Sequence, residues 1–236
     1  MSDTVNIDPK EIAKFDELAA SWWDPSGDFK PLHAINPLRA NWIDALAPVA
    51  GKNLVDVGCG GGILAESMAL RGATVTGIDM SEGPLEVARI HKLESGVDVN
   101  YRQCTAEQLA EEQPGEFDIV CCLEMLEHVP DPASVVKALA TLVKPGGKVF
   151  LSTINRNLKA YALAIIGAEY VLKMLAKGTH DYRKFIKPSE LAQMLRAADL
   201  ELEEMTGMRY NPLTDHFSLH KTDVDVNYML CASKPL

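Results

Sequence analysis

Two carboxylates and an imidazole stand close together near the middle of the chain, at Glu124, Glu127 and His128. They follow an apolar run at 117–123 that is typical of a strand buried on both faces. If a helix begins there, their spacing of i, i+3 and i+4 places all three side chains on one side. They are therefore candidate ligands for Mg²⁺ or Zn²⁺, and Glu127 and His128 are also the candidate catalytic residues. Alternatively, His128 acts alone as a general base, or the segment only shapes a turn.

A second stretch predicts a loop that binds a nucleoside-type ligand. Residues 54–64 read Leu-Val-Asp-Val-Gly-Cys-Gly-Gly-Gly-Ile-Leu, an apolar strand that ends in glycines and leads into a helix. Glycine lets the backbone approach a ligand closely, and the first N–H groups of a helix are free to bind it. The next strand, 73–78, ends at Asp79, 21 residues after Gly58. An acidic residue at this distance is typical of a site that grips a ribose diol.

The glycine pattern excludes two common nucleotide sites. The dinucleotide pattern G-x-G-x-x-G needs a glycine where the chain has Ile63, and the Gly-Lys-Ser/Thr of a phosphate-binding loop is absent. The remaining pattern, Asp-x-Gly-x-Gly-x-Gly from Asp56, resembles the cofactor loop of the class I S-adenosylmethionine (SAM) methyltransferases.

Strands that alternate with helices must position these residues, and they predict an α/β fold with a mostly parallel, doubly wound, Rossmann-like sheet. Ligands of such sheets bind at the carboxyl ends of the strands, where Gly58, Asp79, Leu123 and Glu124 all lie. At the C-terminus we expect strands at 200–207 and 225–233, joined by a loop that includes 214–222. These strands are expected to add to the sheet in antiparallel orientation. The further expected helices are 84–93, 104–110, 134–143 and 188–198, and the further expected strands are 97–101 and 148–153.

Residues 1–48 are expected to form an N-terminal helical cap. The apolar pattern predicts a helix at 9–23, a loop at 30–38 and a helix at 37–47 that begins with Asn36 as N-cap. The paired tryptophans at 22–23 pack in the core or form part of a lid. Arg39 lies near a predicted helix start, where a cation opposes the helix dipole. This placement suggests an anionic partner such as a methionyl carboxylate, although a solvated surface arginine is the alternative.

Composition and charge limit the class of protein. The 236 residues, 47% hydrophobic and 24% charged, predict one globular domain spanning 1–236. The net charge of −10 argues against a nucleic-acid partner. No signal peptide and no charge-free apolar stretch of about 20 residues is found, so a cytoplasmic location is expected. The five cysteines have no metal-binding spacing and are expected to be reduced thiols.

An insertion at 155–187 differs from the rest of the chain. Residues 160–176 are apolar except for Glu169 and Lys173, and 156–187 carry seven Lys or Arg against two acidic residues. A helix over 160–176 is about 25 Å long, too short and too charged to cross a bilayer. Its basic flanks favour peripheral binding at the inner face of a membrane, or a cap over a lipophilic substrate, and the alternative is a helix buried on the sheet.

Five stretches of the chain resemble the ubiquinone-biosynthesis O-methyltransferases, which belong to the class I SAM methyltransferases. The resemblance extends from about residue 10 to about residue 230. It implies SAM-dependent methylation of two polyprenylated catechols, 2-polyprenyl-6-hydroxyphenol and 3-demethylubiquinol. The stretches are Trp22-Trp23-Asp24, Phe29-Lys30-Pro31-Leu32-His33 with Asn36-Pro37-Leu38-Arg39, residues 56–64, Glu124-Met125-Leu126-Glu127-His128-Val129, and Gly178-Thr179-His180-Asp181.

By the family pattern, Arg39, Gly58, Asp79 and Leu123 line the SAM site, and Gly60 belongs to the same binding loop. The resemblance also implies a divalent metal, held by the two glutamates and the histidine after residue 123. One departure concerns adenine, because many class I enzymes have an acid after the third strand to meet the adenine amine. Here that region reads Cys-Thr-Ala-Glu at 104–107, which leaves the adenine contact open.

The chemistry of a phenol explains why a base or a metal is needed. A phenol has a pKa of about 10 and is mostly protonated at neutral pH, whereas attack on the sulfonium methyl needs the phenolate. A metal or a general base could supply it. Two other functions stay open: C-methylation of a quinol ring, and a non-catalytic SAM-binding module that serves as a scaffold for other ubiquinone-pathway enzymes.

Overall fold

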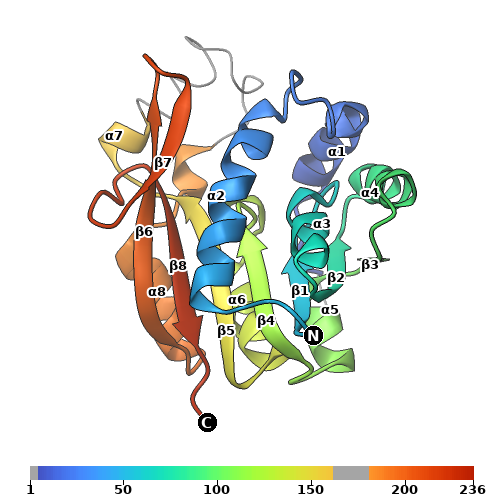
Figure 1. The fold of residues 1–236 in the computed structure, drawn as a ribbon. Helices are drawn as coiled ribbons and strands as arrows, with labels where there is room; N and C mark the ends of the chain where they lie inside the picture. The colour runs from blue at the N-terminus through green and yellow to red at the C-terminus, as the bar shows by residue number, and fades with distance from the viewer. Residues whose placement is uncertain (1–4, 162–180) are drawn as a thin grey trace.

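A mixed sheet forms the centre of the fold (Figure 1). The computed structural model describes residues 5–161 and 181–236, and within these ranges the strand order is β3-β2-β1-β4-β5-β8-β6-β7. The first five strands pair in parallel, β8 is antiparallel to both β5 and β6, and β7 is antiparallel to β6. The predicted Rossmann-like sheet with an antiparallel C-terminal end is therefore confirmed. The strands are β1 (Asn53–Val57), β2 (Thr74–Asp79), β3 (Val99–Gln103), β4 (Phe117–Leu123), β5 (Val143–Ile154), β6 (Glu201–Asn211), β7 (His216–His220) and β8 (Asn227–Ser233).

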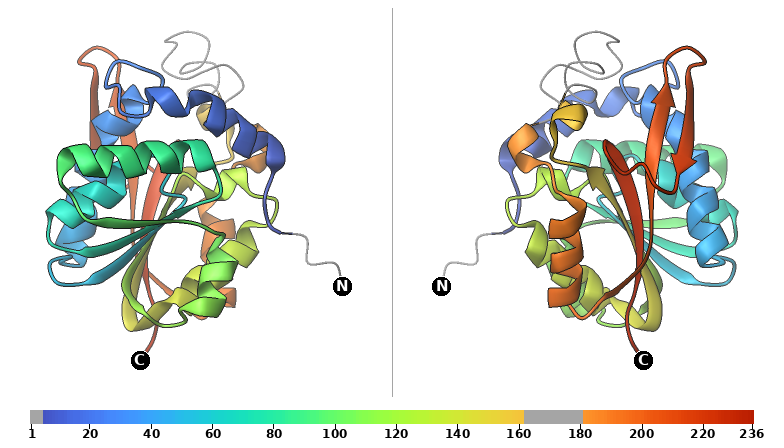
Figure 2. Two further views of the ribbon diagram at one scale, coloured as in Figure 1. Left: turned by 90° about the vertical axis from the view of Figure 1, so that its right-hand side faces the viewer. Right: turned by 90° about the vertical axis from the view of Figure 1, so that its left-hand side faces the viewer.

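Helices cover both faces of the sheet (Figure 2). One face is covered by α2 (Lys30–Leu46), α3 (Ile63–Leu70) and α4 (Glu82–Ser95), and the other by α5 (Ala106–Glu112), α6 (Pro132–Leu142) and α8 (Pro188–Ala197). Each face has its own apolar core. The central strand β4 contributes to both cores. Its neighbouring residues Cys121 and Cys122 are fully buried, and each belongs to a different core. All five cysteines are free and buried.

The N-terminal helix α1 (Pro9–Leu18) and the short η1 (Ala19–Ser21) lie across the carboxyl ends of the parallel strands (Figure 2). Asp8 caps α1 by accepting a hydrogen bond from the Lys10 N–H. Polar contacts fix the helix to distant parts of the chain: the Gly83 N–H donates to Asp16 at 2.9 Å, and the Lys184 ammonium donates to Asp8 at 3.0 Å. The first turns of the chain thus cover the edge of the sheet where ligands of α/β proteins bind.

The predicted loop at 30–38 is wrong, because α2 already begins at Lys30 and contains Pro37. Pro31 supplies the helix-starting proline instead, since a proline in the first turn removes an N–H that has no partner there. The side chain of Asn36 does not cap the helix. It donates to the Ile63 carbonyl at 3.2 Å and to the Ser67 hydroxyl at 2.7 Å, which joins α2 to α3.

The predicted C-terminal loop over 214–222 is also wrong, because it contains β7, which forms a hairpin with β6. Exposed and half-buried side chains alternate along β7, as expected for an edge strand with one face toward the protein. A Cβ atom at Gly207 would lie 1.6 Å from the Asp223 carbonyl oxygen. Only glycine fits at this crossing of β6 and the segment before β8.

The structure does not describe residues 162–180. Nearly all of the predicted apolar helix at 160–176, and the centre of the predicted insertion at 155–187, lie within this range. The ends of the insertion are α7 (Leu158–Ala160) and η4 (Tyr182–Lys184). None of the helices within residues 5–161 and 181–236 has the length and apolar character needed to span a bilayer.

Candidate active site

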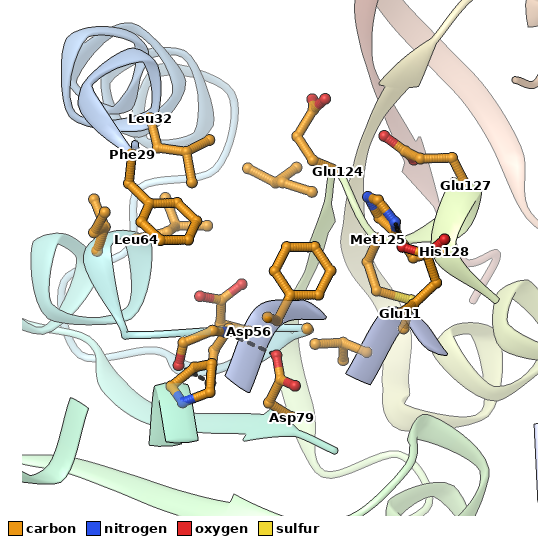
Figure 3. A pocket seen from close by; sticks show the side chains of 18 of the residues that line it. Glu11, Phe29, Leu32, Asp56, Leu64, Asp79, Glu124, Met125, Glu127 and His128 are labelled. Atoms are coloured by element: carbon orange, nitrogen blue, oxygen red, sulfur yellow. Dashed lines mark hydrogen bonds and ion pairs between the residues drawn. The ribbon is translucent and has the colours of Figure 1, made fainter. Parts of the chain in front are cut away.

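A cavity of about 590 Å³ lies at the carboxyl ends of the strands and is lined in part by residues of α1 and α2. Every residue that the sequence singled out for the cofactor or for catalysis lines it. The cavity thus joins the glycine loop and the acidic residue after β2 to the cluster after β4, as Figure 3 shows for part of the lining. The predicted residues are Arg39, Gly58, Gly60, Asp79, Leu123, Glu124, Glu127 and His128.

The glycine loop adopts a conformation that L side chains rarely reach. Gly58, Gly60 and Gly62 have φ of 74°, 51° and 88°. A Cβ atom at Gly58 would lie 2.6 Å from a side-chain carbon of Met125, so the loop also has no room there. The Gly60 N–H donates to Asp79 at 2.8 Å, and the other oxygen of that carboxylate accepts from the Ser81 N–H. The loop and the acidic residue are thus fixed to each other.

Asp56, near the end of β1, is a second acid in this part of the cavity and is buried (Figure 3). Burial raises its pKa to about 7, and the negative charge of Asp79 adds to the shift. Burial also raises the pKa of Asp79. Two acids that are poorly solvated make this end of the cavity favourable for a ligand that carries positive charge. Asp56 is the first residue of the glycine motif in the sequence, but the motif did not predict that its side chain is buried.

Arg39 is buried, with 6% of its surface exposed, so the alternative of a solvated arginine is wrong. Its Nη2 donates to Glu124 Oε1 at 2.6 Å. Burial lowers the pKa of Arg39, which the charge of Glu124 opposes. Ser152 and Asn227 also donate to the Glu124 carboxylate. The anionic partner of Arg39 in the structure is therefore a residue of the chain itself.

The predicted helical start after β4 is not found. Glu124 has φ of 55°, in the left-handed region, and a single 3₁₀ turn, η2 (Leu126–His128), follows. As a result, Glu124 faces Arg39, and Glu127 accepts a hydrogen bond from the Thr153 hydroxyl at 2.7 Å. Within residues 5–161 and 181–236, no three His, Cys, Asp or Glu side chains converge closely enough to hold a metal ion as they stand.

His128 pairs with a residue that the sequence analysis missed. Its Nδ1 lies 3.0 Å from the Glu11 carboxylate of α1, and Figure 3 shows the two side chains next to each other. The hydrogen bond with His128 and the bond from Lys184 lower the pKa of Glu11 to about 2. The carboxylate is therefore ionised at neutral pH and can only accept, so Nδ1 carries the proton. In the neutral ring this leaves the lone pair on Nε2, which can bind a metal or take a proton.

Glu127 provides a second atom suited to a metal or a proton. Its Oε1 is buried and has no hydrogen-bond partner within the part of the chain that the structure describes. Burial raises the pKa of Glu127 to about 7, and the charge of Glu124 contributes. Two carboxylates and an imidazole are suitable donors for Mg²⁺ or Zn²⁺, and the orphaned oxygen fits such an ion. The side-chain atoms of the three residues are therefore of the right kind to bind the predicted metal. In the structure, however, the three side chains do not point toward one common position.

The comparisons with known proteins identify the family. A methyltransferase domain family matches residues 32–205. The ubiquinone biosynthesis O-methyltransferase of Pseudomonas paraeruginosa is 67% identical over 225 residues, which cover 95% of this chain and 97% of that protein. The enzyme of the same name from Saccharophagus degradans is 65% identical and covers 98% of both chains. The chain belongs to the ubiquinone-biosynthesis O-methyltransferase family. The predicted resemblance is therefore confirmed.

Solved structures of other methyltransferases have the same fold as this member of the family. Magnesium protoporphyrin IX methyltransferase from Synechocystis, with bound S-adenosylhomocysteine (SAH), is similar with a TM-score of 0.68 and 21% identity, covering 94% of each chain. A SAM-dependent methyltransferase from Thermotoga maritima is similar with a TM-score of 0.69 and 19% identity, covering 95% of this chain and 99% of that one. These likenesses confirm the class I methyltransferase fold.

The segment after β3 also lines the cavity of this family member. Thr105 caps α5: its side chain accepts from the Gln108 N–H at 3.2 Å, and the Gln108 side chain accepts from the Thr105 N–H at 3.0 Å. The nearby acid, Glu107, accepts from Asn6 and Ser134. Thr105 and Glu107 thus both make contacts within the protein, and neither is assigned to adenine.

Proposed function

We propose that this chain transfers the methyl group of SAM to a catechol hydroxyl of polyprenylated ubiquinone precursors, 2-polyprenyl-6-hydroxyphenol and 3-demethylubiquinol. The observation that carries the proposal is one cavity that connects a glycine loop, with its fixed carboxylate, to a histidine–glutamate pair. The names of relatives at 65% and 67% identity support the pathway and the reaction on oxygen. The large apolar part of the cavity wall, from α1, α2 and the β6–β7 hairpin, suits a lipophilic substrate.

In this proposal SAM lies along the glycine loop. Gly58 and Gly60 allow its close approach, Asp79 accepts hydrogen bonds from the ribose hydroxyls, and Leu123 borders the methionine part. Arg39 faces the anionic end of the cofactor. The buried Asp56 and the half-buried Asp79 favour the positively charged sulfonium over its neutral product.

We further propose that Glu124, Glu127 and His128 hold a divalent cation, Mg²⁺ or Zn²⁺, while the catechol is bound. Such an ion lowers the pKa of a hydroxyl that it contacts and so supplies the phenolate. The chain prepares the site by fixing His128 through Glu11, with Nε2 as the available ring atom, and by leaving Oε1 of Glu127 without a partner within the described residues. A carboxylate behind a metal-binding imidazole is a common arrangement.

The test is methyl transfer from labelled SAM to a short-tailed demethylubiquinol, with EDTA and after addition of Mg²⁺ or Zn²⁺. We expect EDTA to abolish transfer and the metal to restore it. Full activity in EDTA would contradict the metal and assign the proton to His128 as a general base. Bound SAM without any transfer would favour a non-catalytic SAM-binding module.

The domain and the membrane surface form a second part of the proposal. We propose that residues 1–236 are one methyltransferase domain with a cap at 1–48 and an insertion at 155–187, and that the insertion binds the inner face of a membrane, where other ubiquinone-pathway enzymes could associate. Its apolar sequence between basic residues supports this role, because such segments bind anionic lipid surfaces.

Vesicle flotation tests the membrane contact. Replacing Leu163, Ile165 and Ile166 by serine should abolish flotation with anionic vesicles, since the apolar surface that enters the lipid is removed. Leu213→Ser is the matched control, because this leucine is 94% exposed on the β6–β7 turn and lies far from the insertion in the sequence. Equal flotation of the triple variant and the control would contradict the proposal.

A further inference from the structure

The indole ring of Trp22 lies flat against the glycine loop. A Cβ atom at Gly60 would lie 2.1 Å from the benzene part of the ring, and one at Gly61 would lie 2.2 Å from its pyrrole part and 2.7 Å from Nε1. The glycines at these two positions therefore make room for an indole. Trp22 also lines the cavity that contains the proposed cofactor site, as does Gly60.

The N–H of this indole is buried and has no hydrogen-bond partner within residues 5–161 and 181–236. Trp22 as a whole is only 6% exposed, so water reaches the residue poorly. Buried tryptophan N–H groups normally find an acceptor, because leaving one unpaired loses the hydrogen bond that water gave it. A partner is thus missing at a wall of the cavity, next to the cofactor loop.

The ring is held in this orientation from several sides. Trp22 stacks on Phe29 with 4.0 Å between ring centres, and its carbonyl oxygen lies 2.9 Å from His33 Nε2. The following residue, Trp23, donates through Nε1 to the Gly61 carbonyl at 2.9 Å and stacks on His91 at 3.4 Å. Turning the indole of Trp22 toward an acceptor elsewhere would break its stacking on Phe29, while the other contacts hold the backbone of Trp22 and the neighbouring Trp23 in place.

A second buried donor in the same cavity also lacks a partner. Nε of Arg39 has no hydrogen-bond partner within the described residues, although its Nη2 binds Glu124. Two unpaired donors call for acceptors on a bound ligand, and because one donor belongs to a guanidinium, an anionic acceptor gives the stronger hydrogen bond. SAM has a single anionic group, the methionyl carboxylate.

We infer that Trp22 is a cofactor-binding residue whose indole N–H donates to the methionyl carboxylate of SAM, beside Arg39. The inference rests on the proposed SAM site and adds a residue from the N-terminal cap to it. It also gives the cap a role in cofactor affinity: the carboxylate can form its full set of hydrogen bonds only when residues 19–23 lie over the glycine loop.

Calorimetric titration with two ligands tests the inference. SAH carries the carboxylate, whereas its decarboxylated form, S-adenosyl-3-thiopropylamine, has the same nucleoside, thioether and amine without it. Trp22→Phe should raise the Kd of SAH by a factor of about 10 to 100, as expected for a lost hydrogen bond to a charged acceptor, and leave the Kd of the decarboxylated ligand unchanged. Trp23→Phe is the matched control and should affect both ligands equally, because Trp23 contacts the loop and not the cavity.

An equal loss for both ligands with Trp22→Phe would mean that the ring only packs, and tighter SAH binding would mean that it obstructs the site; either result overturns the inference. If the wild-type chain binds neither ligand, the proposed SAM site itself fails. NMR of the wild-type protein provides a measurement that needs no stable variant at position 22. The indole N–H signal should shift strongly with SAH and little with the decarboxylated ligand, and equal shifts would contradict the assignment.

Discussion

Replacing His128 by asparagine should reduce kcat for methyl transfer by about 10²–10⁴-fold, while the Kd of SAH stays unchanged. The asparagine amide can still donate to Glu11 from near the position of Nδ1, but it lacks the Nε2 lone pair that the Glu11 pair makes available. The effect falls on kcat because the phenolate is needed for the chemical step and not for cofactor binding. Steady-state kinetics with saturating SAM, together with SAH titration, measure the two quantities.

His220→Asn is the matched control, because this histidine is exposed on β7, at the edge of the sheet. It should leave kcat unchanged. Activity of the His128 variant close to that of the control would contradict the proposed role of the histidine, both as a metal ligand and as a base. A variant that loses SAH affinity as strongly as activity would instead place His128 in cofactor binding.

Replacing Arg39 by methionine is expected to lower the free energy of unfolding by about 3–5 kcal/mol. The substitution removes the guanidinium from Glu124, whose side chain is only 20% exposed, and leaves a poorly solvated carboxylate. The hydrogen bonds from Ser152 and Asn227 remain, but neither carries a charge. Urea unfolding of the ligand-free protein measures the effect.

A double-mutant cycle identifies its cause. Adding Glu124→Gln to the methionine variant should restore part of the lost stability, because a neutral amide costs less than a carboxylate at this poorly solvated position once the guanidinium is absent. Arg102→Met is the control for a pair near the surface: Glu112, its partner, is 53% exposed, so a loss of at most about 1 kcal/mol is expected. Equal losses for the two arginine variants would contradict a buried, structurally important pair at Arg39.

The sequence was most informative where the local pattern determines the geometry. The glycines at 58, 60 and 62 need positive φ, and the strand that ends at Asp79 is parallel to β1, so the loop and the acid meet as predicted. The alternation of helices and apolar strands likewise determines which residues lie at the carboxyl ends. Each of these features depends on neighbours in sequence or on the shared direction of parallel strands.

Features that depend on distant contacts could not be predicted. Glu11 lies 117 residues from His128, and only the docking of α1 brings them together. Glu124, Glu127 and His128 were predicted to share one side of a helix, but the positive φ of Glu124 directs its side chain to another part of the site. The predicted start of α2 was wrong because Pro37 was interpreted as a first-turn proline, whereas Pro31 fills that position. In the C-terminal part, pairing with β6 makes a strand of a segment whose polar sequence is typical of a loop.

The N-terminal cap does more than cover the sheet, because it contributes side chains to the candidate active site. It brings Glu11 to His128, the proposed catalytic residue, and places Trp22 against the glycine loop, and all of these line one cavity. If the proposed roles of Trp22 and His128 are correct, cofactor binding and substrate activation both depend on this folded segment. Proteolysis or deletion within residues 1–23 is accordingly expected to affect both.

The most direct test of the account is to determine which atom of the substrate receives the methyl group. The enzyme would be incubated with SAM labelled in the methyl carbon and a short-tailed demethylubiquinol, and the product examined by NMR. The account predicts a single labelled methoxy group at the former catechol hydroxyl. A labelled methyl group on a ring carbon would show C-methylation of the quinol and would contradict catechol O-methylation as the activity of this cavity.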